Sequence, residues 1–308
     1  MERSPVVFRI PMRDRFRGQS AREGMLIHGP AGWGEFSPFP EYGPRECARW
    51  LACAREAAFE GWPAPVRASV PVNATVPAVP PERAFELVRR AGCGTAKVKV
   101  AERGQDFAED MARVEAVRDA LGPSGRIRVD ANGAWSVDEA VRRLKALSRF
   151  GLEYAEQPCA TLEDLARVRR RAGVPIAADE SIRRAEDPLR VRAAEAADVA
   201  VVKVQPLGGV RNALRVVEAC GLPAVVSSAV ETSIGLAAGL ALAAALPELP
   251  YACGLGTMTL LSGDVVKDSL VPVGGEIEVR RPVVDAGLLS EFEIESPLWL
   301  RRMQEAAS

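Results

Sequence analysis

The sequence predicts an α/β protein: a (β/α)-barrel, or modified TIM barrel, with a smaller α+β capping domain at its N-terminus. From about residue 69 onward, short β-branched runs alternate with segments of helical period, the pattern of repeated βα units around a parallel sheet. Strand ends recur about every 25 residues, a length that suits one βα unit in a barrel. No GxGxxG turn follows the first strand, which disfavours an open dinucleotide-binding sheet.

Eight short runs rich in β-branched residues and alanine are expected to form the barrel strands. They cover residues 69–76, 95–100, 126–132, 152–158, 175–181, 199–206, 224–230 and 251–257. Segments of helical period lie between them at 81–92, 106–122, 136–151, 161–173 and 209–221. These segments end in Gly, where a left-handed residue can close a helix.

Residues 1–66 differ in pattern and are expected to form the capping domain. Within them, residues 6–13 and 24–36 resemble antiparallel strands, and residues 44–61 resemble a helix. The barrel is then expected to span residues 67–269. Strand and turn character returns in residues 269–279, so the tail, residues 270–308, is expected to pack back on the capping domain.

Composition indicates a compact soluble protein and narrows its partners. The 40 basic and 41 acidic residues give a formal charge of −1, and no basic block could follow a phosphate backbone, so nucleic acid is not expected. The start lacks an apolar signal region, and the run at 234–246 is too short to span a bilayer, so no membrane role is expected. Six scattered cysteines favour reduced thiols in the cytoplasm. The oligomeric state stays open, a monomer included.

Two scarce residue types bear on the chemistry. His28 is the only histidine, which argues against Ser-His-Asp triads and HExxH zinc sites, and its place favours a surface strand residue. Lysine is also scarce, and the chain otherwise uses arginine; the lysines are Lys97, Lys99, Lys145, Lys203 and Lys267. Because arginine stays protonated whereas burial can tune a lysine, each lysine is a candidate base.

The last residues of the expected strands are unusually polar. In a (β/α)-barrel these positions surround the active site. In chain order they are Lys97 and Lys99, Asp130 and Asn132, Glu156, Asp179 and Glu180, Lys203, and finally Ser227, Ser228 and Glu231. Three consecutive strands therefore end in a carboxylate, and strands that end in lysine flank them on both sides.

Asp130, Glu156 and Asp179 are candidate ligands of a hard divalent cation. Three oxygen ligands at one barrel mouth suit Mg²⁺, with Mn²⁺ as a substitute, because further positions remain for water and substrate oxygens. Each carboxylate taken alone could instead cap the helix after its strand. Three in sequence between lysines favour the metal.

The lysines suggest removal of a proton next to a carboxylate. Such a proton is very weakly acidic, and Mg²⁺ lowers the cost of forming the resulting enediolate. Lys97 and Lys99 are two residues apart, so they point to the same side of one strand and each disfavours the charge of the other. One would act as base and the other would tune it. A solvated strand edge is the alternative for this pair.

Short motifs in register carry a resemblance to a known family. AKVKV (96–100), VDANGAW (129–135), EQP (156–158), ADES (178–181) and VVKVQPLGG (201–209) resemble the muconate-lactonizing branch of the enolase superfamily in order and spacing. Three further segments are most similar to the short bacterial o-succinylbenzoate synthase family: GWGEFSPF (32–39), SSAVETSIG (227–235) and CGLGT (253–257).

The resemblance implies a carbon–oxygen lyase of menaquinone biosynthesis, which acts on a small carboxylate. Its reaction is the syn dehydration of 2-succinyl-6-hydroxy-2,4-cyclohexadiene-1-carboxylate to o-succinylbenzoate. The resemblance makes Lys99 the group that takes the α-proton and returns it to the departing hydroxyl, and Lys203 the cation that stabilises the enediolate, with a cation–π contact to the substrate ring. Lys97 is the remaining lysine of the expected catalytic set.

The same resemblance implies residues that meet the substrate and residues that support the metal ligands. Substrate contacts would come from Ser227, Ser228, Gly254 and Arg17, the last in a loop with Phe16 and Gly18 that closes the site. Support for the metal ligands would come from Asn132 and Glu180.

Other enzymes that use the same lysines and metal ligands remain as alternatives: an N-acylamino acid racemase, a dipeptide epimerase or a muconate cycloisomerase. Two facing lysines suit a racemase, since each can serve one face of the substrate. Dipeptide epimerases of this branch typically carry an Asp-x-Asp pair at the eighth strand, where residues 253–256 read Cys-Gly-Leu-Gly, which counts against them. A silent metal-binding barrel would not need lysines on both sides of the ligands.

Overall fold

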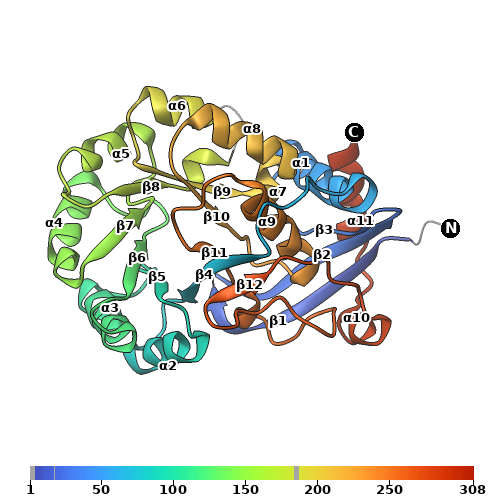
Figure 1. Ribbon diagram of the computed structural model, residues 1–308, viewed down its shortest axis with the longest axis horizontal. Coiled ribbons are helices and arrows are strands. Elements are labelled where there is room, and N and C mark those ends of the chain that lie inside the picture. The colour runs from blue at the N-terminus through green and yellow to red at the C-terminus, as the bar shows by residue number, and fades with distance from the viewer. Residues whose placement is uncertain (1–3, 17, 184–186) are drawn as a thin grey trace.

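A computed structural model describes residues 4–16, 18–183 and 187–308. Figure 1 shows a barrel of strands ringed by helices and, beside it, a three-stranded antiparallel sheet. The predicted fold class, a (β/α)-barrel with an N-terminal α+β capping domain, is confirmed.

The barrel is a closed sheet of parallel strands that pair in chain order. Its strands are β4 (Ser69–Val76), β5 (Thr95–Lys99), β6 (Arg126–Asp130), β7 (Leu152–Glu156), β8 (Ile176–Ala178), β9 (Val199–Lys203), β10 (Ala224–Ser227) and β11 (Cys253–Gly256). Parallel pairing of β11 with β4 closes the barrel. All the predicted barrel strands are therefore present. A further short strand, β12 (Glu276–Glu278), pairs antiparallel with the start of β4.

Helices form the outer layer of the barrel (Figure 1). They are α2 (Pro81–Ala91), α3 (Phe107–Leu121), α4 (Val137–Leu147), α5 (Leu162–Arg169), α6 (Asp187–Ala193), α7 (Val204–Leu207), α8 (Val210–Cys220) and α9 (Ser233–Ala245). Short 3₁₀ segments lie in three of the connections between described elements: η2 (Ser148–Phe150) follows α4, η3 (Glu180–Ile182) follows β8, and η4 (Met258–Leu260) follows β11. The side chains of Asp106, Ser136 and Thr161 cap the first turns of α3, α4 and α5.

The barrel interior changes character along its axis. Alternate residues of each strand point inward. In the N-terminal half these inward residues form an apolar cluster that includes Tyr154, Val199, Val201 and Val225. The outward residues join the main core, which fills the space between strands and helices. Toward the C-terminal strand ends the inward positions become charged, and this change places the site.

The capping domain combines a sheet with helices from both ends of the chain. Its elements are β1 (Val6–Phe16), β2 (Gln19–Gly29), β3 (Gly32–Phe36), α1 (Pro44–Arg55), the π-helical turn η1 (Glu56–Glu60), α10 (Ala286–Phe292) and α11 (Pro297–Ala307). Residues 24–36 make parts of two strands joined by a tight turn. In the tail, β12 lies against the barrel, whereas α11 lies against α1, and Trp299 meets Phe36 edge-on with ring centroids 6.0 Å apart.

Helices α6, α7, α9, α10 and α11 were not among the predicted ones. Helix α7 replaces the end of the strand expected over 199–206, since β9 already ends at Lys203. In α9 the reason is clear, since this Ala-, Gly- and Leu-rich helix is buried on nearly every side and therefore lacks an amphipathic period. Among the described residues, no helix combines the length and the apolar character needed to cross a membrane.

Candidate active site

The charged strand ends meet at one mouth of the barrel. Strand pairing places Lys99 beside Asp130, and Asp130 beside Glu156. From the opposite side, Lys203 at the end of β9 pairs with Oδ2 of Asp179, the residue that follows β8. All five side chains are buried. The candidate ligands and the lysines therefore share one buried site.

Lys97 and Lys99 both reach the carboxylates next to them. Lys97 Nζ lies 3.2 Å from Oδ2 of Asp130 and 2.8 Å from Oε1 of Glu156. Lys99 Nζ lies 2.5 Å from the same oxygen of Asp130. The two lysines thus point to the same side of β5, as their spacing requires.

The lysines offset the effect of burial on the pKa of Asp130 more fully than on the pKa of Glu156. Burial would raise the pKa of Asp130, but the ammonium groups of Lys99 and Lys97 hold it well below its usual range. Burial, together with the charge of Asp130, raises the pKa of Glu156 to about 8, and Lys97 offsets this only in part. Glu156 is therefore the carboxylate that most lacks a cation.

The pKa values of Lys203 and Lys97 shift in opposite directions. Burial would raise the pKa of Asp179, but Lys203 and Arg183 lower it. Burial lowers the pKa of Lys203 by more than Asp179 raises it. Burial also acts to lower the pKa of Lys97, but the surrounding carboxylates outweigh it and raise that pKa. Lys97 is thus held charged, whereas burial works against the charge of Lys203 and its pairing with Asp179 works for it.

The donor set fits a hard divalent cation. Four buried carboxylate oxygens have no hydrogen-bond partner in the described part of the chain: Oε2 of Glu156, Oδ1 of Asp179, Oε2 of Glu180 and Oε2 of Glu231. Two of them belong to the candidate ligands Glu156 and Asp179. Leaving such oxygens unpaired is costly, and a cation with oxygen ligands would satisfy them. Residues 4–16, 18–183 and 187–308 contain no ready-made group of three Asp, Glu, His or Cys ligands. Lysine ammonium groups lie among the oxygens instead.

Asn132 links Lys99 to the outer part of the site. Its Oδ1 accepts a hydrogen bond from Lys99 Nζ at 2.5 Å, and its Nδ2 donates to Oε1 of Glu180 at 3.1 Å. Asn132 has φ +46°, a left-handed conformation that asparagine tolerates better than most residues. The position just after β6 thus orients Lys99.

Gln157 and Arg183 are polar residues of the mouth that the sequence did not single out. Gln157 Oε1 accepts from the backbone N–H of Asp179 at 3.0 Å, and Arg183 Nη2 lies 2.8 Å from Oε1 of Glu180. Gln157 sits at φ +38°, which is uncommon for this residue type. Their positions gave a usable signal, since Gln157 follows a candidate ligand and Arg183 lies four residues after another.

The predicted substrate contacts at the last two barrel strands lie together. Ser227 pairs with Gly254, where an added Cβ would lie 2.6 Å from Ser227 Oγ, so the close approach requires glycine. The N–H of Ser228 donates to the Gly254 carbonyl at 3.0 Å. The Ser228 hydroxyl lies 2.6 Å from that of Thr257, a residue the sequence did not flag.

The β1–β2 turn reaches the mouth from the capping domain. Lys99 Nζ lies 5.2 Å from the centroid of the Phe16 ring, within cation–π range. Gly18 follows with φ +74°. Arg17, the remaining residue of the predicted closing loop, lies outside the described residues.

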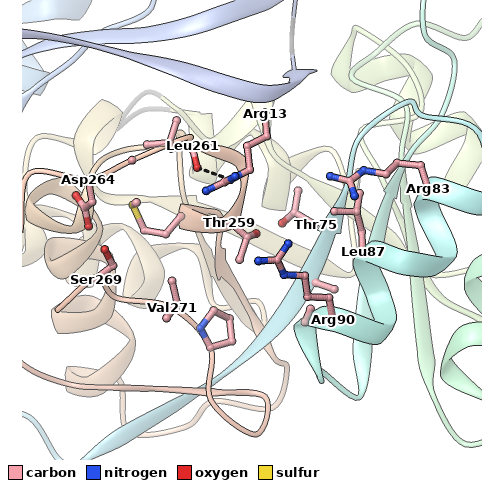
Figure 2. A pocket seen from close by; sticks show the side chains of 15 residues that line it. Arg13, Thr75, Arg83, Leu87, Arg90, Thr259, Leu261, Asp264, Ser269 and Val271 are labelled. Carbon is pink, nitrogen blue, oxygen red and sulfur yellow. Dashed lines mark hydrogen bonds between the residues drawn. The ribbon is translucent and has the colours of Figure 1, made fainter. Parts of the chain in front are cut away.

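A separate cavity of about 350 Å³ opens beside the barrel, between α2 and the segment that follows β11. Figure 2 shows Arg13, Arg83 and Arg90 around it, with Arg13 Nε bonded to the Leu261 carbonyl at 2.9 Å. None of the predicted site residues lines it. The chemistry of the strand ends, rather than this cavity, therefore defines the candidate site.

Comparison with protein families matches both parts of the chain. The family described as enolase N-terminal domain-like matches residues 7–58, and the family described as enolase C-terminal domain-like matches residues 81–291.

Curated relatives share most of the sequence. An o-succinylbenzoate synthase of Thermobifida fusca is 70% identical over 97% of this chain and 94% of the relative. An o-succinylbenzoate synthase of Mycolicibacterium smegmatis is 54% identical over 98% of this chain and 94% of the relative.

Solved structures share the fold at low identity. A muconate cycloisomerase from Pseudomonas fluorescens superposes with a TM-score of 0.80 at 22% identity, covering 95% of this chain and 98% of that one. The L-Ala-D/L-Glu epimerase from Bacillus subtilis gives a TM-score of 0.78 at 23% identity, covering 96% and 98%. On the family matches and the relatives together, the chain belongs to the enolase superfamily and, within it, to the o-succinylbenzoate synthase family.

Proposed function

We propose that the chain catalyses the Mg²⁺-dependent syn dehydration of 2-succinyl-6-hydroxy-2,4-cyclohexadiene-1-carboxylate to o-succinylbenzoate, a step of menaquinone biosynthesis. One observation carries the chemistry: Lys99 pairs with Asp130 and Lys203 pairs with Asp179, on opposite sides of one barrel mouth whose carboxylates are buried. The 70% identity to the Thermobifida fusca o-succinylbenzoate synthase supports this substrate.

Asp130, Glu156 and Asp179 would hold the Mg²⁺, or Mn²⁺ in its place. The unpartnered oxygens of Glu156 and Asp179 support this assignment. When bound, the ion supplies positive charge to the substrate carboxylate, which makes the neighbouring C–H group more acidic.

The three lysines of the mouth balance its three candidate ligands in charge, so a divalent ion would leave the site positive. Surplus positive charge disfavours a further charged lysine and favours an anionic substrate. Lys97 contacts two of the ligands and stays charged. We assign the proton transfer to Lys99, which Asn132 orients and which the resemblance to the family makes the base.

Lys99 handles both proton transfers in this reaction. The C–H bond breaks as Lys99 takes the α-proton, and the electron pair of that bond moves into the ring system. The C–O bond then breaks as Lys99 returns the proton to the hydroxyl group, which leaves as water and gives an aromatic ring. One group can do both because the two bonds lie on the same face. Lys203 contributes its positive charge from the other side.

Polar groups at the last two strands would bind the ends of the substrate. We assign this role to Ser227, Ser228 and Gly254, with Arg17 from the capping domain, and the support is their place in the resemblance together with the adjacency of the first three. Phe16 beside Lys99 supports closure of the mouth by the β1–β2 turn.

We also propose that the capping domain spans residues 1–66 with 270–308 packed on it, that the barrel spans 67–269, and that the enzyme works in the cytoplasm. Contacts of α11 with α1 support the first point, although β12 pairs with the barrel. Six free, buried thiols support a reducing compartment.

A racemase of N-acylamino acids is the second candidate. Lys99–Asp130 and Lys203–Asp179 are similar pairs on opposite sides of the site, and the lowered pKa of Lys203 suits a second proton-transfer group.

Proton NMR in D₂O separates these functions. Purified protein with Mg²⁺ is incubated with the cyclohexadiene carboxylate and, separately, with N-succinylamino acids. We expect new aromatic resonances from the first substrate, and none in a Lys99→Ala control. Exchange of the α-proton of the amino acids without any aromatic product would overturn the lyase assignment.

A further inference from the structure

Glu35 is a buried carboxylate of the capping domain that binds to the barrel. It lies in β3 and is 3% exposed. Its Oε2 accepts hydrogen bonds from the backbone N–H of Thr232 at 3.1 Å, the Thr232 hydroxyl at 2.5 Å and the N–H of Gly235 at 3.2 Å. Thr232 is the N-cap of α9. Glu35 therefore satisfies the first free amides of a barrel helix, where negative charge is also favoured by the helix dipole.

The segment held in this way connects directly to the substrate serines. Ser227 ends β10, and residues 228–232 lead from it into α9. Val230, in the middle, has φ +62°, a strained conformation for a β-branched residue. Its N–H donates to the Ser228 hydroxyl at 2.9 Å. The conformation of this segment thus fixes the Ser228 side chain.

A second residue of the capping domain also binds the segment of residues 228–232. Arg22 in β2 is 3% exposed, and its Nε donates to the Val230 carbonyl at 2.9 Å while Nη2 donates to the Ser37 carbonyl at 2.7 Å. The approach is close, because a Cβ on Gly235 would lie 2.9 Å from Cδ of Glu35. A strained conformation persists only where its surroundings hold it, and here those contacts include two residues of the capping domain.

We infer that Glu35 is a positioning residue for substrate binding: through the N-terminus of α9 it sets the place of Ser227 and Ser228. This inference rests on the proposed function in one respect, namely that these serines meet the substrate. On this inference the capping domain acts on the site in two ways: through the β1–β2 turn and through the buried contact of Glu35 with α9.

Glu35→Gln tests the inference, with Asp264→Asn as the matched control. Asp264 is also buried and also caps α9, accepting from the N–H of Ser233 at 3.2 Å and from its hydroxyl at 2.5 Å. Its other hydrogen bond within the described residues is to the N–H of Val265, so none of these bonds involves residues 228–232. Both variants should lower the melting temperature by similar amounts, because each weakens one buried cap.

The kinetic constants of the Mg²⁺-loaded variants then separate positioning from general stability. We expect Glu35→Gln to raise KM about five- to tenfold, the effect of weakening one charge-assisted hydrogen bond, with kcat within about twofold of wild type. Asp264→Asn should leave KM within about twofold. Equal KM changes in both variants, or a fall in kcat alone for Glu35→Gln, would overturn the inference.

Hydrogen exchange gives a readout that does not depend on turnover. In the Mg²⁺-loaded protein without substrate, the amides of Ser228 and Val230 should exchange faster in Glu35→Gln than in wild type or Asp264→Asn. Unchanged exchange at these two amides contradicts the inference, whatever the enzyme turns over. Absence of aromatic product from the wild type, by contrast, removes only the proposed function. If Glu35→Gln does not fold, Thr232→Val removes the hydroxyl donor to the same carboxylate and should give the same two changes.

Discussion

The two ends of the barrel interior differ in how their buried charged side chains are paired. At the N-terminal end, Arg128 Nε lies 2.6 Å from Glu153, Nη1 donates to Asn73 and to the Ala252 carbonyl, and the guanidinium lies 4.7 Å from the ring centroid of Tyr154. These contacts hold one cation in one place, although its Nη2 has no hydrogen-bond partner among the described residues. At the C-terminal end, lysines and carboxylates share contacts and leave carboxylate oxygens unpartnered among the described residues.

The difference assigns the two ends to different tasks. A cation held by a carboxylate, an amide and an aromatic face contributes to the stability of the fold. A network in which the pKa values of Lys97 and Lys203 are shifted and carboxylate oxygens are unsatisfied is costly to the fold, and such networks mark functional sites. Substitutions at the N-terminal end should therefore change stability, and substitutions at the mouth should change activity.

The largest effect is expected from removing the metal or its ligands. EDTA should abolish turnover, and Mg²⁺ or Mn²⁺ should restore it. In Asp179→Asn combined with Glu156→Gln, kcat/KM should fall at least about 10³-fold, because the ion supplies several kcal/mol of charge stabilisation. Calorimetric titration with Mg²⁺ should show binding to the wild type and none to the double variant. Full activity after exhaustive chelation would remove the metal from the account.

At the other end, Arg128→Ala should lower the free energy of unfolding by about 3–5 kcal/mol, since it removes the buried partner of the Glu153 carboxylate and leaves it only the exposed Arg126. Chemical denaturation at constant pH measures this loss. The kcat of the folded fraction should stay within about twofold of wild type. A large fall in kcat without loss of stability would show that the two ends are not separate.

A smaller effect is expected from Val201→Ala in the interior cluster. The side chain is 1% exposed, and its truncation should cost about 2 kcal/mol through lost burial and the cavity that remains. Denaturation should detect this cost, with Mg²⁺ affinity unchanged. Weaker Mg²⁺ binding in this variant would mean that packing of the interior sets the geometry of the mouth.

The sequence predicted the barrel and the mouth because both depend on local patterns. The strands are short runs rich in β-branched residues, and several of them end in a charged residue, so Asp130, Glu156 and Lys203 could be placed on strand ends without any contact information. Pairing of neighbouring strands then brought these ends together.

Other features depend on contacts between distant parts of the chain. Glu35 and Thr232 are 197 residues apart in sequence, and nothing in GWGEF indicates that its carboxylate caps a barrel helix. The helix α9 lacks a polar face because it is buried almost all round, so its period is invisible. Arg183 gains its role only once η3 places it beside Glu180.

The central claim is that one lysine of the mouth moves the proton and the other supplies charge. Arginine keeps the charge but does not shuttle a proton near neutral pH, so dehydration of the cyclohexadiene carboxylate by Lys99→Arg and Lys203→Arg, each loaded with Mg²⁺, tests it most directly. We predict that Lys99→Arg is as inactive as Lys99→Ala, about 10²–10⁴-fold or more below wild type, while Lys203→Arg retains measurable formation of the aromatic product. Equal and complete loss in both arginine variants, with both still binding Mg²⁺, would contradict the account.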